Sequence, residues 1–534
     1  MKLGKASKIL IISLLFGIIN VYTSFITKND GRIFFQNVIL IVNIIVVALL
    51  FAFLGNKLER YCGLICLNKC SENYHSYKKT FWKTFFLQVV IWLVFFCAYY
   101  PGITGYDFGG QIPQTIGGIA SEKTNWISRN YTTHHPLLHT LYLQFFYYII
   151  GGKIFSDYNI GIAIGTIIQI IIFSLMIAFS HAYLNACGVI KCIRYAYVLF
   201  TCFFPYYSMI VIANIKDVFF AGFVAVLFTC LSYFTNSGVV FFERRKINCI
   251  FILSVIGCIL FRNNGLYPCL AIAIVQLIIS FKKNNWKVFS MIFGGCTFAL
   301  LLLAILFRVL QADKGSPNEM LSIPYQQISA VYNEHYDELS DYVRDEIELI
   351  VPNVSKYTKN ISDPVKDEAN GFANLGVFLR LYFELGLEFP QSYINAFLNT
   401  NAGYLSIADV GFDVVKGSMG MIETDTNNSL ETVKQRPILP VLHDFLEFLY
   451  TDNNYQSIFV FRIICRPAIY MWVETLLLIF AFTKRRSAIL PLVFFVTLVL
   501  TMLAGPCVLV RYMLPVVVCI PGIIGLFYSK SLRD

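Results

Sequence analysis

The sequence predicts an all-α polytopic membrane protein. We expect about twelve transmembrane helices, an interfacial helix in the first large outer loop, and a mainly helical extracytoplasmic domain. Hydrophobic residues make up 57% of the 534 residues and charged residues only 14%, whereas soluble domains hold about 45–50% apolar and about 25% charged residues. Apolar runs long enough to cross a bilayer core of about 30 Å recur from end to end. An ordinary soluble enzyme is therefore excluded.

Apolar windows between polar or charged residues define the expected spans. A further run, 137–150, is too short to cross comfortably, so we expect it to lie in the membrane interface or to re-enter. The twelve spans lie near 9–27, 34–54, 81–100, 160–183, 193–212, 217–235, 248–262, 266–281, 288–309, 456–483, 487–504 and 511–528.

The orientation follows from Lys and Arg, which gather in every second connecting loop, as cytoplasmic loops require. This pattern predicts a multi-pass protein of the cell (plasma) membrane with cytoplasmic N- and C-termini. Two regions, 101–159 and 311–455, then face outward. Counting 137–150 as a span would place every later basic loop outside, so the charge pattern favours leaving it out.

One stretch of the chain is acidic. Of the 32 Asp and Glu residues, 22 lie within 311–455, which holds only 9 of the 42 Lys and Arg, so it carries about −13 (9 − 22). The basic excess elsewhere is mostly cytoplasmic anchoring, and we expect no nucleic-acid partner. We divide the chain into an N-terminal anchor hairpin with a basic cytoplasmic loop (1–80), a transmembrane core that includes outer loop 101–159 (81–310), an acidic extracytoplasmic domain (311–455) and C-terminal transmembrane helices (456–534).

The first candidate site residue is a carboxylate in a Gly-rich turn. Insertion scales put the cost of a charged residue at a helix centre at about 2.5–3.5 kcal/mol, so charges that remain near the membrane are site candidates. The turn at 100–111 holds one carboxylate, Asp107, with Tyr106 and Gln111 near it. Gly and Pro let the backbone bend tightly and leave room beside the carboxylate. The alternative is a helix cap or an ordinary loop turn.

Three of the seven histidines follow in the same outer loop. His135 and His139 are four residues apart and would share one face of a helix, with His134 beside them. Such a pair suits a divalent cation, contact with a polar substrate, or structural packing. Because no third ligand accompanies the pair, the metal site stays unassigned.

The cations at the outer ends of later spans complete the candidate set. Lys216 stands beside Asp217 and could pair with it or with a phosphate, and Arg262 and Arg511 follow, the last next to Tyr512. Arginine forks onto phosphate oxygens, so this set suits a phospholipid-like anion. Arg462 and Arg466, at the outer start of the tenth span, belong to the same set. The alternative for each arginine is that it only reaches into lipid headgroups.

Together these motifs resemble the C-type superfamily of integral-membrane glycosyltransferases, and more closely a sparsely characterised bacterial branch of it. The resemblance covers about 85–528 and departs at Phe108, because many members carry a second acidic residue there. The motifs that carry it are Tyr100-Pro101-Gly102 with Asp107, His135-Pro136-Leu137, Lys216-Asp217, and Arg511-Tyr512 with Pro515.

The resemblance implies an inverting transfer of a sugar from a polyprenyl-phosphate donor to a cell-envelope acceptor on the extracytoplasmic side. It implies Asp107 as general base and Lys216, Arg262 and Arg511 as donor phosphate ligands, with no certain cofactor. Two alternatives remain, a transporter or flippase of a lipid-linked saccharide and a glycan polymerase or ligase. The residues expected to contact substrate are Tyr106, Gln111, His134, His135, His139, Asp217 and Tyr512.

Overall fold

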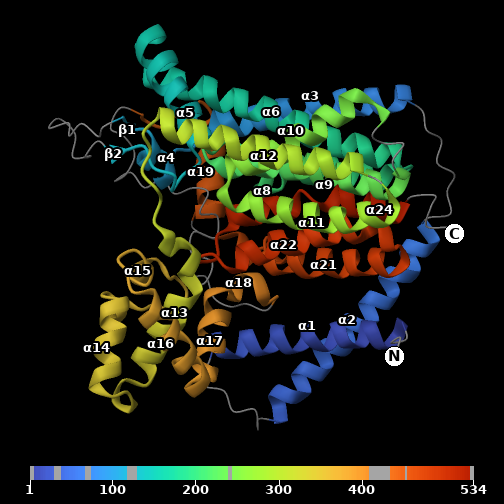
Figure 1. The fold of residues 1–534 in the computed structure, drawn as a ribbon. Helices are drawn as coiled ribbons and strands as arrows, with labels where there is room; N and C mark the ends of the chain where they lie inside the picture. Colours follow the sequence, from blue (N-terminus) through green and yellow to red (C-terminus); the bar gives the residue numbers. More distant parts are fainter. Residues whose placement is uncertain are drawn as a thin grey trace.

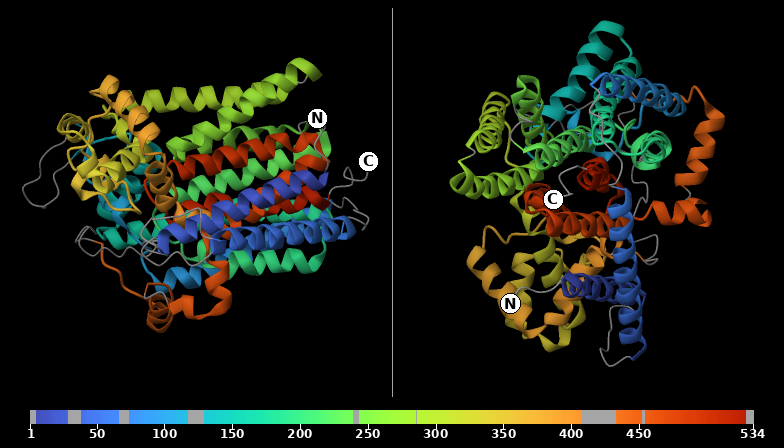
Figure 2. Two further views of the ribbon diagram at one scale, coloured as in Figure 1. Left: turned by 90° about the horizontal axis from the view of Figure 1, so that it is seen from below. Right: turned by 90° about the vertical axis from the view of Figure 1, so that its right-hand side faces the viewer.

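The protein is a helical bundle with a helical domain at one end (Figure 1). We describe it from a computed structural model, which covers residues 5–28, 38–65, 74–116, 129–238, 243–284, 286–407, 433–451 and 454–528. The start of α1 (Lys5–Lys28) and the end of α24 (Ile520–Tyr528) lie at the end of the bundle opposite the helical domain (Figure 2).

Among the described residues, eight helical segments are long and apolar enough to cross a membrane, so the chain is a multi-pass membrane protein in a lipid bilayer. They are α3 (Tyr74–Ala98), α6 (Tyr158–Ala186), α9 (Lys216–Ser237), η3 (Asn263–Gly265) with α11 (Leu266–Lys283), α12 (Trp286–Val309), α21 (Pro467–Lys484), η10 (Arg486–Ala488) with α22 (Ile489–Leu503), and η11 (Val510–Met513) with α23 (Leu514–Val517) and α24.

Four of the twelve expected spans are not among these eight segments. The first two contain shorter apolar stretches, Ile11–Thr27 in α1 and Ile41–Leu54 in α2 (Val38–Ile65). The expected span 193–212 breaks, because α7 (Lys191–Phe203) stops before Pro205 begins the short α8 (Pro205–Ser208). The fourth, α10 (Arg245–Phe261), has 17 residues and packs along α9 and α12. The count of twelve therefore stays a prediction.

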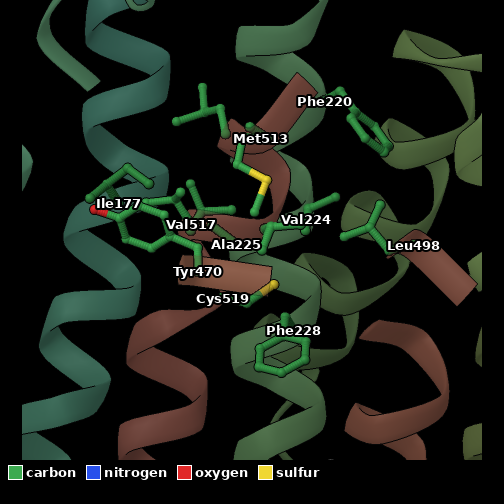
Figure 3. Close-up of a cluster of buried hydrophobic side chains, with 14 of the residues drawn as sticks. Ile177, Phe220, Val224, Ala225, Phe228, Tyr470, Leu498, Met513, Val517 and Cys519 are labelled. Carbon is green, nitrogen blue, oxygen red and sulfur yellow. The ribbon is translucent and has the colours of Figure 1, made fainter. Parts of the chain in front are cut away.

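The bundle is built around α9. In its most apolar stretch 83% of the residues are buried, against 33% in α12, so protein surrounds α9 while α12 leaves much of its apolar surface for lipid. Figure 3 shows part of this core, in which Val224 and Phe228 of α9 belong to the same cluster as Met513 and Val517 of the C-terminal segment. The site described below begins at the first residue of this enclosed helix.

The first outer loop folds into short elements at one end of the bundle (Figure 1). They are α4 (Tyr106–Gln111), the parallel strands β1 (Gln114–Thr115) and β2 (Arg129–Asn130), α5 (Leu137–Gln144) and the π-helix η1 (Phe145–Phe155). The expected interfacial run 137–150 thus lies in α5 and η1, which are not among the spanning candidates. A Cβ on Gly161 of α6 would lie 2.6 Å from Gly151, so η1 packs closely on α6 only because both positions are glycine.

The segment after α12 forms a helical domain with its own core of Tyr325, Ile328, Ile347, Phe378 and Leu381. Within residues 322–350, a short 3₁₀ turn separates two α-helices. The elements of the domain are η4 (Pro317–Leu321), α13 (Ser322–Glu334), η5 (Tyr336–Glu338), α14 (Asp341–Ile350), η6 (Val354–Lys356), α15 (Asp363–Lys366), α16 (Leu375–Glu388), α17 (Pro390–Thr400) and α18 (Ala402–Leu405).

The chain returns to the bundle through short helices. The expected span 456–483 is not one helix. Its long helix begins at Pro467, and Cys465 and Arg466 separate that helix from a short helix before it. The returning elements are α19 (Pro440–Leu446), η8 (Glu447–Thr451), η9 (Asn454–Ser457) and α20 (Phe459–Ile464).

Candidate functional site

The Gly-rich turn carries Asp107 to the first residue of α9. Gly102 has φ of +119°, and a Cβ there would lie 2.4 Å from Thr166 Oγ1, so the turn requires glycine. The next residue, Ile103, donates its N–H to the Ile212 carbonyl at 3.0 Å and accepts from the Asn214 N–H at 2.9 Å. This pairing fixes the turn beside the segment that leads into α9, two residues before Lys216.

Asp107 lies between two cations. Its Oδ2 accepts from Lys216 Nζ at 2.8 Å, and its Oδ1 lies 3.5 Å from Arg511 Nη2. The side chains of Lys216 and Asp107 are 13% and 8% exposed, so the pair is screened little by solvent. Three residues that are far apart in the sequence therefore meet at one point, namely Asp107, Lys216 and Arg511.

A second carboxylate, Asp217, extends the cluster. It is fully buried and accepts a hydrogen bond from Arg262, while its Oδ2 lies 4.0 Å from Arg511 Nε. The guanidinium of Arg262 stands 4.3 Å from the centre of the Tyr512 ring, a cation–π contact. Arg511 thus lies between the two carboxylates, and Tyr512 supports Arg262.

The charges of this cluster do not cancel. It contains three cationic side chains, Lys216, Arg262 and Arg511, and two carboxylates, Asp107 and Asp217. One positive charge is therefore in excess, which a singly charged anion would neutralise.

The pKa of Asp107 is lowered well below its ordinary value. Burial alone would raise the pKa of this carboxyl, but the positive charges of Arg511 and Lys216 outweigh burial. Asp107 is accordingly a carboxylate at neutral pH. It is also a weak base in this arrangement, because its negative charge is already stabilised.

His135 joins the cluster as a neutral ring. Burial, followed by the charge of Lys216, holds the pKa of His135 well below its ordinary value. The ammonium of Lys216 lies 3.0 Å from His135 Nδ1. Because the ammonium can only donate, Nδ1 is the acceptor and the ring proton sits on Nε2.

His139 and Gln111 hold α4 against α5. Gln111 Nε2 donates to the Asp107 carbonyl at 3.0 Å, and its Oε1 lies 2.9 Å from His139 Nδ1 and accepts from Thr140 Oγ1 at 3.0 Å. Burial lowers the pKa of His139 to about 3, so this ring is neutral. Both side chains are fully buried, which makes them supports for Asp107 in this arrangement.

Two candidates remain. The ring of His134 stands 4.6 Å from the ring of His135, so His134 lies at the edge of the cluster. His134 is about half exposed and stands 3.8 Å from Glu319 of the helical domain, so it faces that domain. Tyr106 begins α4, but its side chain lies outside the described part of the chain.

The structure also adds residues that the sequence did not single out. Asn214 and Thr166 hydrogen-bond each other at 3.1 Å behind Gly102, and Asn263 donates to the Thr133 carbonyl at 2.9 Å. The polar Thr166 inside an apolar span is a sequence signal for such a contact. No sequence signal identifies the partner of Asn263, because the two segments are joined only by the fold.

The comparisons with known proteins identify a family. Residues 127–533 match the model of a family of unknown function, DUF6020. The chain belongs to this family. No curated protein and no solved structure matches the chain. The DUF6020 match includes Lys216, Arg262 and Arg511 but begins after Asp107, so the cations of the site lie within the family region and this carboxylate lies before it.

In the described part of this DUF6020 chain, the residues around Asp107 do not fit the divalent cation considered above. Within the part of the chain that the structure describes, no group of three or more His, Cys, Asp or Glu side chains could hold a metal ion. Both oxygens of Asp107 already face cations. These residues therefore do not fit a divalent ion, which would have to displace Lys216 and Arg511.

An apolar groove lies next to the cluster. It has a volume of about 700 Å³ and is bordered by α5, η1 and the last residue of α10, Phe261. Phe261 directly precedes Arg262, the residue that pairs with Asp217. Its lining is Leu138, Leu141, Tyr142, Gln144, Phe145, Tyr148, Ile149 and Phe261.

Proposed function

We propose that this protein is an inverting glycosyltransferase of the plasma membrane, which transfers a sugar from a polyprenyl-phosphate donor to a cell-envelope acceptor on the extracytoplasmic side. The observation that carries the proposal is the meeting of Asp107 with Lys216 and Arg511. A carboxylate and adjacent cations are what the reaction needs, a proton acceptor and a site for the leaving phosphate.

The charge of the cluster favours a particular donor. A sugar linked through one phosphate is a phosphodiester with a single negative charge, and the cluster has one positive charge in excess. A diphosphate-linked sugar would bring a second negative charge into a nearly closed site. We therefore favour the monophosphate donor.

The proposed reaction is one displacement. The acceptor oxygen attacks the anomeric carbon of the donor, and the bond from that carbon to the phosphate oxygen breaks with its electron pair going to the phosphate. The acceptor proton moves to an Asp107 oxygen. The new phosphate charge is stabilised by Lys216, Arg262 and Arg511, which need not give up a proton.

Donor binding would also make Asp107 a stronger base. In the structure Lys216 and Arg511 stabilise the carboxylate, and this is why its pKa is low. If the donor phosphate takes hydrogen bonds from the same two cations, they stabilise Asp107 less and its pKa rises. The carboxylate would then gain basicity only when a donor is present.

The apolar groove supports a lipid-linked donor. Its lining residue Phe261 directly precedes Arg262, so we place the hydrocarbon chain of a donor whose phosphate binds at the cations in this groove. Phe145 and Tyr148 on its lining are partly exposed, so a chain can enter from the side. Burying such a chain would contribute about 25 cal/mol for each Å² of apolar surface removed from water.

The test is an assay of purified protein in liposomes with a panel of polyprenyl-phosphate sugars. A glycosylated acceptor together with free polyprenyl phosphate is the expected result. Protein-dependent movement of the intact donor between leaflets, without covalent change, would instead show a transporter. Transfer of a whole glycan chain would show a polymerase or ligase. Addition of a chelator tests the divalent cation in the same assay, and we expect no loss.

A further inference from the structure

Glu474 carries a carboxyl group near the middle of a spanning helix. It has no part in the proposed transfer reaction. It lies on α21, seven residues after Pro467 and ten before Lys484. It is 3% exposed, so neither water nor lipid headgroups solvate it. A buried ionisable group in a membrane helix is costly unless it has a partner or a role.

In the described part of the chain, no positive charge pairs with Glu474 to stabilise its ionised form. Among the described residues, none forms a hydrogen bond or an ion pair with either of its carboxyl oxygens. The titratable groups that face it are Tyr197 of α7, Tyr207 of α8, Tyr470 of its own helix and Cys519 between α23 and α24. All four are neutral in their ordinary state, so none balances a negative charge.

The position of Glu474 adds a second observation. It faces two interrupted helices, α7 with α8 around Phe204 and α23 with α24 around Val518 and Cys519. Tyr207 of α8 donates to the Val517 carbonyl at 3.5 Å, and Figure 3 shows Val517, Cys519 and Tyr470 in the same core. Interrupted helices around a lone carboxyl are a common setting for ion and proton sites in membrane proteins.

We propose that Glu474 is a proton-binding site in the membrane interior. An unpaired carboxylate in a medium of low polarity is so unfavourable that the group takes up a proton from water and becomes neutral. The bound proton forms an O–H bond with one carboxyl oxygen and removes the charge. The carboxyl faces Cys519 at the junction of α23 and α24, and α23 follows directly on η11, which carries Arg511.

The test is infrared spectroscopy of the purified full-length protein in lipid nanodiscs at neutral pH. The spectrum of wild type minus that of Glu474→Gln should contain the C=O band of a protonated carboxylic acid, shifted in D₂O. Bands of a carboxylate in this difference would overturn the proposal. The control is Glu338→Gln, which removes a carboxylate that is 65% exposed and should give carboxylate bands only.

Two further measurements keep the result unambiguous. Glutamine has nearly the shape of the neutral acid, so Glu474→Gln should keep the thermal midpoint of wild type; a large loss of stability would show that a charge was needed there and would contradict the proposal. Spectra in sodium chloride and in choline chloride at the same pH should be identical. If sodium converts the acid band into carboxylate bands, the site binds a metal cation and the proton assignment is wrong.

Discussion

The ammonium of Lys216 and the carboxylate of Asp107 form a nearly buried ion pair at 2.8 Å, although 109 positions separate them in the sequence. The pair joins the first outer loop to the first residue of α9, which protein surrounds. Its two members are also the base and one of the phosphate ligands of the proposed reaction. Stability and activity therefore depend on the same contact. Each variant of the pair needs one measurement of stability and another of activity.

Asp107→Asn should lower turnover by about 10²–10⁴-fold, because the amide cannot accept the acceptor proton. The shape of the side chain is kept, so insertion into the membrane should be normal. Rates from the liposome assay give the effect. Asp341→Asn, at a carboxylate that is 94% exposed, is the matched control and should be fully active. Turnover near that of wild type in Asp107→Asn would exclude the general-base assignment.

Lys216→Met should destabilise the protein by about 3–5 kcal/mol, because it leaves Asp107 buried with one cation fewer. Asn at 107 should offset part of this loss, since the uncompensated charge is then gone. A double-mutant cycle of unfolding free energies should give a coupling of about 0.5–3 kcal/mol. Additive effects of the two changes would show that the ion pair contributes no energy of its own.

The pH profiles should differ between free protein and donor complex. Because the folded-state pKa of Asp107 is depressed, its ion pairs contribute stability above the ordinary pKa of 3.8 and lose it as the pH falls through the lower folded value. The acid limb of kcat/KM, which reports the free protein, should lie below that ordinary value. The acid limb of kcat should lie at higher pH, because donor phosphate then shares Lys216 and Arg511. Coincident limbs would contradict activation of Asp107 by the donor.

Gly102→Ala should destabilise the protein by about 1–3 kcal/mol, because a residue with a Cβ is strained at φ of +119° and would press on Thr166. The shift of the turn should also reduce turnover. Thermal unfolding and the transfer assay measure both. Gly376→Ala is the control, since a Cβ there meets nothing within 4 Å in α16, and it should be neutral or slightly stabilising.

A larger side chain in the groove should discriminate between long and short donors. Leu141→Trp reduces the space, so KM for a long-chain polyprenyl-phosphate sugar should rise while KM for a short-chain analogue stays unchanged. Leu500→Trp, at an exposed position of α22, is the control. Equal effects on both donors would show that the groove does not hold the hydrocarbon chain.

Part of this arrangement could be predicted from the sequence. An apolar chain has few places for charged residues, so Asp107, Lys216 and Arg511 stood out, and the order of basic loops placed them on one side. Their partners could not be predicted. Lys216 and Asp217 are adjacent, which suggested a pair, but successive residues of a helix point about 100° apart. In the structure they turn to different partners, Asp107 and Arg262.

One helix break was missed although the sequence contains its signal, Pro205. Hydropathy averages over a window and does not register that α7 ends at Phe203 before Pro205, so 193–212 looked like one span. The requirement for Gly102 depends on Thr166, 64 positions later in the chain, which only the fold brings close.

Because α9 begins at Lys216, the site also lies at the positive end of a 22-residue helix. The aligned peptide dipoles of such a helix act like about half a positive charge at its N-terminus. This field comes from the backbone, so no side-chain substitution at the site removes it. Variants that lack one cation should therefore still attract a phosphate, more weakly and with less control over its position.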